Sequence, residues 1–282
     1  MAAFVLACHS YMKESKTYGF YANESATIHM ASGKRKKVRN VIIGCSLAYV
    51  GSTFRVADGI LSLGYGGHSF LDRALEQFNF KFSYCLVDHY SSRFAKGYLS
   101  FGATPPSNIS MTYATLYANE VIRPYYYVDV MGISVDGVML DIPPIVWDLR
   151  SMGGAILDCG STLTYLPEQA YRPLMNALME GLKGFERVKF APFEFCFSTK
   201  KGFTDDMAPK MVWHWGESVR FEPPVKNYLI EVEDTETRCA GLMPLDWPNE
   251  TLIGNIMQQG HHWEFDYMNG VLGFRPSPCV ST

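Results

Sequence analysis

One carboxylate in the sequence follows an apolar run and begins a turn rich in small and hydroxyl residues. The segment 155–167 reads AILDCGSTLTYLP, so Asp158 stands directly after a predicted strand. Burying a carboxylate is costly unless donors reach its oxygens. Gly160 allows close approach of the backbone, and the hydroxyls of Ser161 and Thr162 can donate hydrogen bonds. The pattern makes Asp158 a candidate for acid–base chemistry, although a strand that ends in an ordinary Asp-x-Gly turn has the same signature.

The cysteines give no metal-binding pattern. There is no Cys-x-x-Cys pair and no His-x-x-x-His neighbour among the residues, so we expect no metal and no cofactor. Because the sequence has 7 cysteines, at least one thiol is free or pairs outside the chain. Three Asn-x-Ser/Thr patterns, which also arise by chance, favour a secretory environment, and their glycosylation candidates are Asn23, Asn108 and Asn249.

The elements that would position Asp158 are predicted to be mostly β, with few short helices. Short runs rich in Val, Ile, Tyr and Phe recur between Gly, Asn, Asp and Pro, as at 26–30, 41–45, 98–101 and 125–130. Asp136-Gly137 gives the strongest hairpin signal, because this pair readily supplies the positive φ angles of a tight turn. Helices are expected at 69–78, capped by Ser69, and after Pro167, where Pro173 should kink the helix or shorten its first turn.

We expect two lobes. Residues 103–124 contain Pro105-Pro106 and polar residues, so we predict the connection between the lobes there. This division places a partial N-terminal β lobe at 1–119 and a C-terminal β lobe, which carries Asp158, at 120–282.

Composition and charge narrow the choice of partners. A formal net charge of -3 and a pI near 6.2 give no electrostatic reason to expect nucleic acid or an anionic membrane. The basic run at 34–39 is expected at a solvated hairpin tip, and no apolar run approaches the length of a membrane span. The first residues are apolar but lack a basic leader and a convincing cleavage site, so the chain looks truncated at its amino end.

Longer stretches of the chain resemble pepsin-like aspartic proteases. Residues 155–162 are similar to the second active-site loop of that family, in which two hydrophobic residues precede Asp-Thr/Ser-Gly-Thr/Ser. Residues 57–64 resemble the element that crosses behind the first loop, and 252–255 resemble its counterpart. Three further phrases are similar to the nepenthesin-like plant branch, namely FSYCLV at 82–87, YYV with GISV at 126–135, and NIMQQ at 255–259.

The resemblance implies a bilobal pepsin-like fold and an aspartic endopeptidase. In this family two carboxylates about 3 Å apart share one proton and activate a water that attacks a peptide carbonyl. Asp158 would be one of the two, in an active-site loop with Cys159, Gly160, Ser161 and Thr162. The substrate would be an extended peptide or protein segment, bound as an added strand in the interlobe cleft of a monomer. Family membership also implies secretion, to the cell wall or to the vacuole.

The resemblance fails at the first active-site loop. A second Asp-Thr/Ser-Gly-Thr/Ser phrase, expected upstream of the flap, is absent from the sequence. Aligning 19–24 with the strand after the flap leaves only 1–18 ahead of it, so we expect the chain to lack this loop. Tyr11 is the flap candidate, and a surface residue in a frayed terminus is the alternative. Peptide cleavage by this chain should therefore be impaired or absent.

The cysteines also bear on the resemblance to pepsin-like aspartic proteases. Cys159 takes the position that Thr or Ser usually fills, whose hydroxyl ties the two active loops together in the family. Sulfur is a poor donor and acceptor, so that tie should be weaker, and an ordinary free thiol also fits the position. Cys196 and Cys239 match the carboxyl-lobe disulfide of the family, whereas the partners of Cys45, Cys85 and Cys279 stay open.

Two other functions compete with a protease. Some plant relatives share the fold but inhibit glycoside hydrolases that degrade cell walls, and the loss of a catalytic loop is compatible with such a binding protein. Retention of Asp158, Gly160 and Ser161 in a recognisable loop argues against it. A homodimer in which two copies of Asp158 meet, as in retroviral relatives, is disfavoured because most of an N-terminal lobe occupies the place of a second copy.

Overall fold

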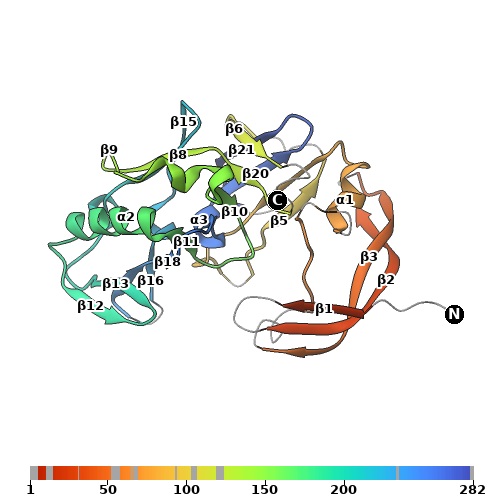
Figure 1. Ribbon diagram of the computed structural model, residues 1–282, viewed down its shortest axis with the longest axis horizontal. Helices are drawn as coiled ribbons and strands as arrows, with labels where there is room; N and C mark the ends of the chain where they lie inside the picture. The colour runs from red at the N-terminus through yellow and green to blue at the C-terminus, as the bar shows by residue number, and fades with distance from the viewer. Residues whose placement is uncertain are drawn as a thin grey trace. The chain divides into compact units, whose positions relative to one another are not determined.

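The computed structural model describes residues 6–10, 15–30, 32–51, 58–64, 66, 69–92, 94–102, 107–118, 124–232 and 235–279 (Figure 1). Within these ranges the protein is mostly β, and the chain divides into two compact units. Unit 1 comprises residues 1–80 and 119–124, and unit 2 comprises residues 81–118 and 125–282. No helix within the described residues is long and apolar enough to cross a membrane.

Unit 1 is built around a long antiparallel hairpin, coloured red to orange in Figure 1. Strands β1 (Leu6–Ser10), β2 (Lys16–His29) and β3 (Arg35–Val50) form a three-stranded sheet in that order. At the tip the Met30 amide donates to the Lys34 carbonyl at 2.8 Å and Gly33 has a φ of 78°, so the basic run 34–39 begins at the tip and continues into β3. Helix α1 (Phe70–Leu75) packs against β3 and buries Leu71, Ala74 and Leu75.

The described part of unit 2 forms three sheets. The largest has ten strands, in the order β18 (Leu242–Leu245), β11 (Thr164–Pro167), β19 (Thr251–Ile253), β10 (Ala155–Leu157), β7 (Tyr127–Val128), β6 (Thr112–Tyr117), β21 (Val271–Pro276), β20 (His261–Asp266), β4 (Lys81–Cys85) and β5 (Tyr98–Phe101). The second sheet has four strands, in the order β12 (Arg187–Phe190), β13 (Phe193–Ser198), β17 (Thr237–Ala240) and β16 (Leu229–Glu231). The third also has four, in the order β15 (Val219–Phe221), β14 (Met211–Trp215), β8 (Val130–Val135) and β9 (Val138–Met139).

Helices in unit 2 are few. Within its described residues they are α2 (Glu168–Gly181), the single turn α3 (Asn255–Gln258), and the 3₁₀ helices η2 (Pro144–Trp147), η3 (Leu149–Ser151), η4 (Asp205–Met207) and η5 (Val225–Asn227). The buried face of α2 carries Tyr171, Leu174, Met175 and Leu178, the residues whose spacing predicts it. The helix continues past Pro173, so its first turn is not shortened, and the alternative expectation of a kink there stays a prediction; packing of the apolar face offsets the missing hydrogen bond.

Several local predictions are confirmed. Asp136 and Gly137 have φ angles of 49° and 79° and join β8 to β9 as a tight hairpin. Ser69 caps α1 by accepting a hydrogen bond from the Asp72 amide, although the helix ends at Leu75 rather than near residue 78.

The predicted connection at 103–124 is wrong for part of its length. Thr112–Tyr117 form β6, which lies inside the ten-stranded sheet between β7 and β21. Strands β4, β5 and β6 therefore belong to the same sheet as the carboxyl-terminal strands, whereas the lobe boundary at 119/120 stays a prediction. The Pro-rich sequence before β6 obscured a strand that long-range pairing stabilises.

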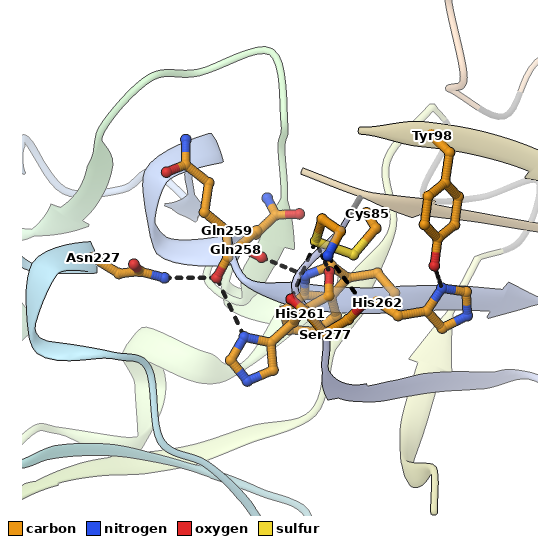
Figure 2. Close-up of a disulfide and its surroundings, with 10 residues drawn as sticks. Cys85, Tyr98, Asn227, Gln258, Gln259, His261, His262 and Ser277 are labelled. Atoms are coloured by element: carbon orange, nitrogen blue, oxygen red, sulfur yellow. Dashed lines mark hydrogen bonds between the residues drawn. A yellow bond between two sulfur atoms is a disulfide. The ribbon is translucent and has the colours of Figure 1, made fainter. Parts of the chain in front are cut away.

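The core of unit 2 is aromatic and is fixed by disulfides. The ring centroid of buried Trp263 lies 5.2 Å from that of Phe221 and 5.4 Å from that of Phe274. Cys196 and Cys239, the pair that the resemblance implies, form a disulfide that joins β13 to β17. A second disulfide joins Cys85, at the end of β4, to Cys279 (Figure 2). Sequence alone left that pairing open.

Candidate active site

Strand β10 delivers Asp158 to the end of a buried run. Ala155, Ile156 and Leu157 are all buried, and β10 pairs in parallel with β19 and antiparallel with β7. The Asp158 amide donates to the carbonyl oxygen of Ile253 at 3.0 Å, which extends the ladder by one residue. The half-buried side chain of Asp158 therefore begins at a fixed point of the sheet.

Both oxygens of the Asp158 carboxylate have donors from its own turn. The Gly160 amide donates to Oδ1 at 2.9 Å, and the Ser161 hydroxyl donates to Oδ2 at 2.6 Å. A Cβ at position 160 would lie 3.0 Å from Asp158 Oδ1, so a larger residue would press on the carboxylate. The predicted hydrogen bond from Ser161 is present and the backbone at Gly160 approaches closely as predicted, whereas Thr162, the other predicted donor, lies exposed in the same turn and its hydroxyl is not among the two donors to Asp158.

The same local pattern occurs at an exposed turn, so it does not identify a site by itself. Asp148 accepts a hydrogen bond from the Arg150 amide at 3.1 Å and another from the Ser151 hydroxyl at 2.9 Å. The Asp158 turn differs in its surroundings. It is supported from behind by β19 and α3, whose backbone binds it directly.

This support comes from the segment 252–255, which we predicted to cross behind the loop. Strand β19 lies between β10 and β11. The Asn255 amide donates to the Ser161 carbonyl at 2.7 Å, and the Ile256 amide donates to the Thr162 carbonyl at 3.2 Å. A Cβ on Gly254 would lie 2.1 Å from the Leu163 carbonyl oxygen, so glycine is required at this crossing.

Cys159 follows Asp158 in the turn, and its backbone contacts α3. Its thiol is free and half-buried, and its carbonyl oxygen accepts a hydrogen bond from Asn255 Nδ2 at 3.2 Å. Burial, and after it the charge of Asp158, raise the pKa of the Cys159 thiol. The thiol is therefore protonated and poorly nucleophilic at neutral pH.

Tyr84 of β4 is a buried neighbour that sequence reasoning did not assign to the site. Its hydroxyl donates to Gln258 Oε1, and Gln258 Nε2 donates to the Ile253 carbonyl at 2.7 Å. Burial raises the pKa of Tyr84 well above its ordinary value, and Cys159 and Asp158 add to the effect through their charges. The only sequence signal for these supports was the pair of family-like phrases FSYCLV and NIMQQ.

The other predicted residues lie elsewhere. Tyr11 falls outside the described residues. Asn23, Asn108 and Asn249 are exposed, and their glycosylation stays a prediction. Cys45, like Cys159, is a free thiol. An open pocket of about 460 Å³ lies in unit 2 beside Val130, Trp147 and Arg150, and Asp158 does not line it.

Comparison with solved structures defines the fold. The chain is similar to the crystal structure of edgp, with a TM-score of 0.77 and 19% identity over 94% of this chain and 72% of that chain. It is equally similar to the crystal structure of basic 7S globulin from soybean, with a TM-score of 0.77 and 18% identity over 97% of this chain and 72% of that chain. The fold is the mostly β pepsin-like fold, and with the Asp158 loop it defines an aspartic protease-like protein.

Family models agree with this class. The chain belongs to the family described as xylanase inhibitor C-terminal, whose model matches residues 125–276. The model described as xylanase inhibitor N-terminal matches residues 6–103.

Relatives of this chain are plant aspartic proteases by name. It is 33% identical to Aspartyl protease family protein 2 of Arabidopsis thaliana over 281 residues, which cover 96% of this chain and 54% of the relative. It is 26% identical to Aspartic proteinase nepenthesin-2 of Nepenthes gracilis, covering 96% of this chain and 60% of the relative. The chain thus spans little more than half the length of these relatives.

Proposed function

We propose that Asp158 is one of the two carboxylates of an aspartic endopeptidase site. The observation that carries the proposal is the loop itself, because a half-buried carboxylate with a donor on each oxygen stands at the end of β10 with β19 crossing behind it. That arrangement suits a group that must exchange a proton with a bound water. The nepenthesin-like branch, which the phrases at 82–87 and 255–259 favour, is the part of the family we assign.

These 282 residues contain one Asp-x-Gly-Ser/Thr loop, so we propose that alone they cleave peptides weakly or not at all. In the two-carboxylate mechanism one group accepts a proton from water while the other protonates the substrate carbonyl. Loss of one general acid or base typically costs about 10² to 10⁴ in rate. The loss here is expected to exceed that range, because activation of the water depends on the shared proton.

The test is acid proteolysis of a denatured protein by the purified chain, beside Asp158→Asn and Asp148→Asn. Asp148 is a matched control, because it accepts the same two hydrogen bonds from residues two and three positions ahead. We expect cleavage near background for all three proteins. Robust cleavage that Asp158→Asn abolishes and Asp148→Asn preserves would contradict the proposed impairment and assign the catalytic role to Asp158.

A non-catalytic binding protein is the second candidate. Cys159 in place of a hydroxyl residue favours it, as does the description of both matching family models as xylanase inhibitor domains. The partner would then be a secreted glycoside hydrolase of the xylanase class. Immobilised chain should retain fungal xylanase and reduce its activity, and free passage of a panel of xylanases would remove this candidate.

We further propose that the chain acts as a monomer in a secretory compartment. Support comes from two disulfides among the described cysteines and from exposed Asn side chains in all three glycosylation patterns. Sedimentation at equilibrium should give a mass near 31.8 kDa before glycans are added. A mass of twice that value would instead support a dimer.

A further inference from the structure

Side-chain amides continue the support of the Asp158 loop toward a histidine in the segment that follows β4. Asn255 Nδ2 donates to the Cys159 carbonyl at 3.2 Å, and Asn255 Oδ1 accepts from Gln259 Nε2 at 2.9 Å. Gln259 Oε1 accepts from both the backbone amide and the ring Nδ1 of His89, at 2.8 and 2.7 Å. His89, Gln259, Asn255 and the Cys159 carbonyl thus form one chain of hydrogen bonds, which we call the amide relay.

Each donor in the amide relay faces the next residue in the direction from His89 to Cys159. A carbonyl oxygen can only accept, so His89 Nδ1 must carry a proton and Gln259 must turn Oε1 toward His89. This orientation leaves Gln259 Nε2 to face Asn255 Oδ1, and Asn255 must then present Nδ2 to the Cys159 carbonyl. The two donors of His89 therefore determine how each amide downstream is turned.

The start of the amide relay is itself held in place. Next to His89, Asp88 forms an ion pair with Lys226 and accepts a hydrogen bond from the Tyr90 amide at 2.9 Å. Burial alone would raise the pKa of Asp88, but the hydrogen bonds from Lys226 and the Tyr90 amide outweigh it and lower the pKa. Asp88 is therefore charged above acidic pH and holds the segment 88–90 against η5.

The middle of the amide relay is anchored through the backbone of Gln259. Its carbonyl accepts hydrogen bonds from Asn227 Nδ2 at 2.9 Å and from His261 Nδ1 at 3.3 Å, as Figure 2 shows. The next amide, of Gly260, donates to Leu86 at 3.1 Å, one residue from the Cys85–Cys279 disulfide. The backbone at Gln259 is thus held in place, and this fixes the point from which its side-chain amide reaches His89 and Asn255.

We propose that His89 and Gln259 are positioning residues for the Asp158 loop, acting through Asn255 on the carbonyl of Cys159. The inference deepens the proposed function and rests on it for the catalytic meaning of the loop. Its physical content, restraint of the Cys159 backbone by His89, can be measured without any catalysis. Cys159 is a built-in reporter, because its half-buried thiol reacts faster when the loop opens.

The test uses iodoacetamide on the native protein, with peptide mapping of modified Cys159 and of Cys45, a free half-buried thiol in unit 1, as the internal reference. His89→Phe removes the ring donor, and Gln259→Glu keeps the size of the side chain but replaces its donor with an acceptor. Both should raise the ratio of Cys159 to Cys45 modification about fivefold or more, the factor that corresponds to one hydrogen bond of about 1 kcal/mol.

Two control variants separate positioning from general loosening. His89→Asn retains a side-chain N–H near the place of Nδ1 and should restore the ratio to within about twofold of the parent. Gln77→Glu makes the same amide-to-acid change in unit 1, outside the amide relay, and should leave the ratio unchanged. Thermal unfolding of each variant confirms that it is folded at the assay temperature.

Equal modification ratios in His89→Phe, Gln259→Glu and the parent would overturn the proposal. If Gln259→Glu does not fold, the pair His89→Phe and His89→Asn decides alone, since His89 is partly exposed and its replacement leaves the core intact. Peptide cleavage that persists in Asp158→Asn would remove the proposed catalytic role of Asp158, whereas the modification ratio in His89→Phe would still decide whether the amide relay positions the loop. The two failures are therefore distinguishable.

Discussion

Acidification should destabilise unit 2 through His262, a fully buried histidine in β20. Its ring Nδ1 lies 2.8 Å from the Tyr98 hydroxyl, as Figure 2 shows, while Nε2 has no hydrogen-bond partner among the described residues. Burial, and then the positive charge of Arg275 on the neighbouring strand, lower the pKa of His262 from 6.5 to about 4. Protonation would place a charge in a buried site where Nε2 has no described acceptor to receive its proton.

The sign and size of this loss of stability follow from the linkage between protonation of His262 and unfolding. Between pH 6.5 and 4 the unfolded chain holds a proton on this residue that the folded protein does not, so stability falls as the pH falls through this window. The difference between 6.5 and about 4, at about 1.4 kcal/mol for each pH unit, amounts to about 3 to 4 kcal/mol of unfolding free energy, of which about 3 kcal/mol is lost by pH 4, where the folded-state group is half protonated. The pKa of His261 is also lowered by burial, which adds to the loss in the same direction.

Urea unfolding at pH 7 and at pH 4, with the disulfides intact, measures the effect in the parent and in His262→Asn. Asparagine can still accept a hydrogen bond from Tyr98 but does not titrate, so the variant should lose about 3 kcal/mol less than the parent between the two pH values. His29→Asn, at an exposed position of β2, is the control and should leave the pH dependence unchanged. An identical loss in the parent and in His262→Asn would refute the reasoning.

Two further predictions concern stability. Gly254→Ala should destabilise the protein by about 3 kcal/mol or more, because its Cβ meets a backbone carbonyl that cannot move, whereas Gly184→Ala, with open space around it, should cost less than about 1 kcal/mol by thermal unfolding. Lys81→Met should cost about 3 kcal/mol in urea unfolding, because it removes the cation that lies 3.1 Å from the buried carboxylate of Glu264. The same change at Lys183, whose ion pair is exposed, should have little effect, and equal costs at the two lysines would count against this account.

Much of the local structure could be predicted from sequence. The Asp136-Gly137 hairpin, the Ser69 cap and the apolar face of α2 were all found at the predicted positions, because each depends on neighbours within a few residues. Strand β6 was missed. The apolar and polar residues of this six-residue strand alternate only weakly. Its place in the sheet comes from pairing with β7, which follows it in the chain, and with β21, near the carboxyl end.

The candidate site likewise has a part that the local sequence determines and a part that depends on tertiary packing. The sequence by itself determined the turn at Asp158, since the strand before it, the glycine and the Ser161 hydroxyl are adjacent along the chain. Only the tertiary structure placed Tyr84 beside that turn, paired Cys85 with Cys279 and turned the amides of Asn255 and Gln259 toward it. Contacts of this kind join residues up to 194 positions apart, and they depend on how strands pack rather than on any pattern within one segment.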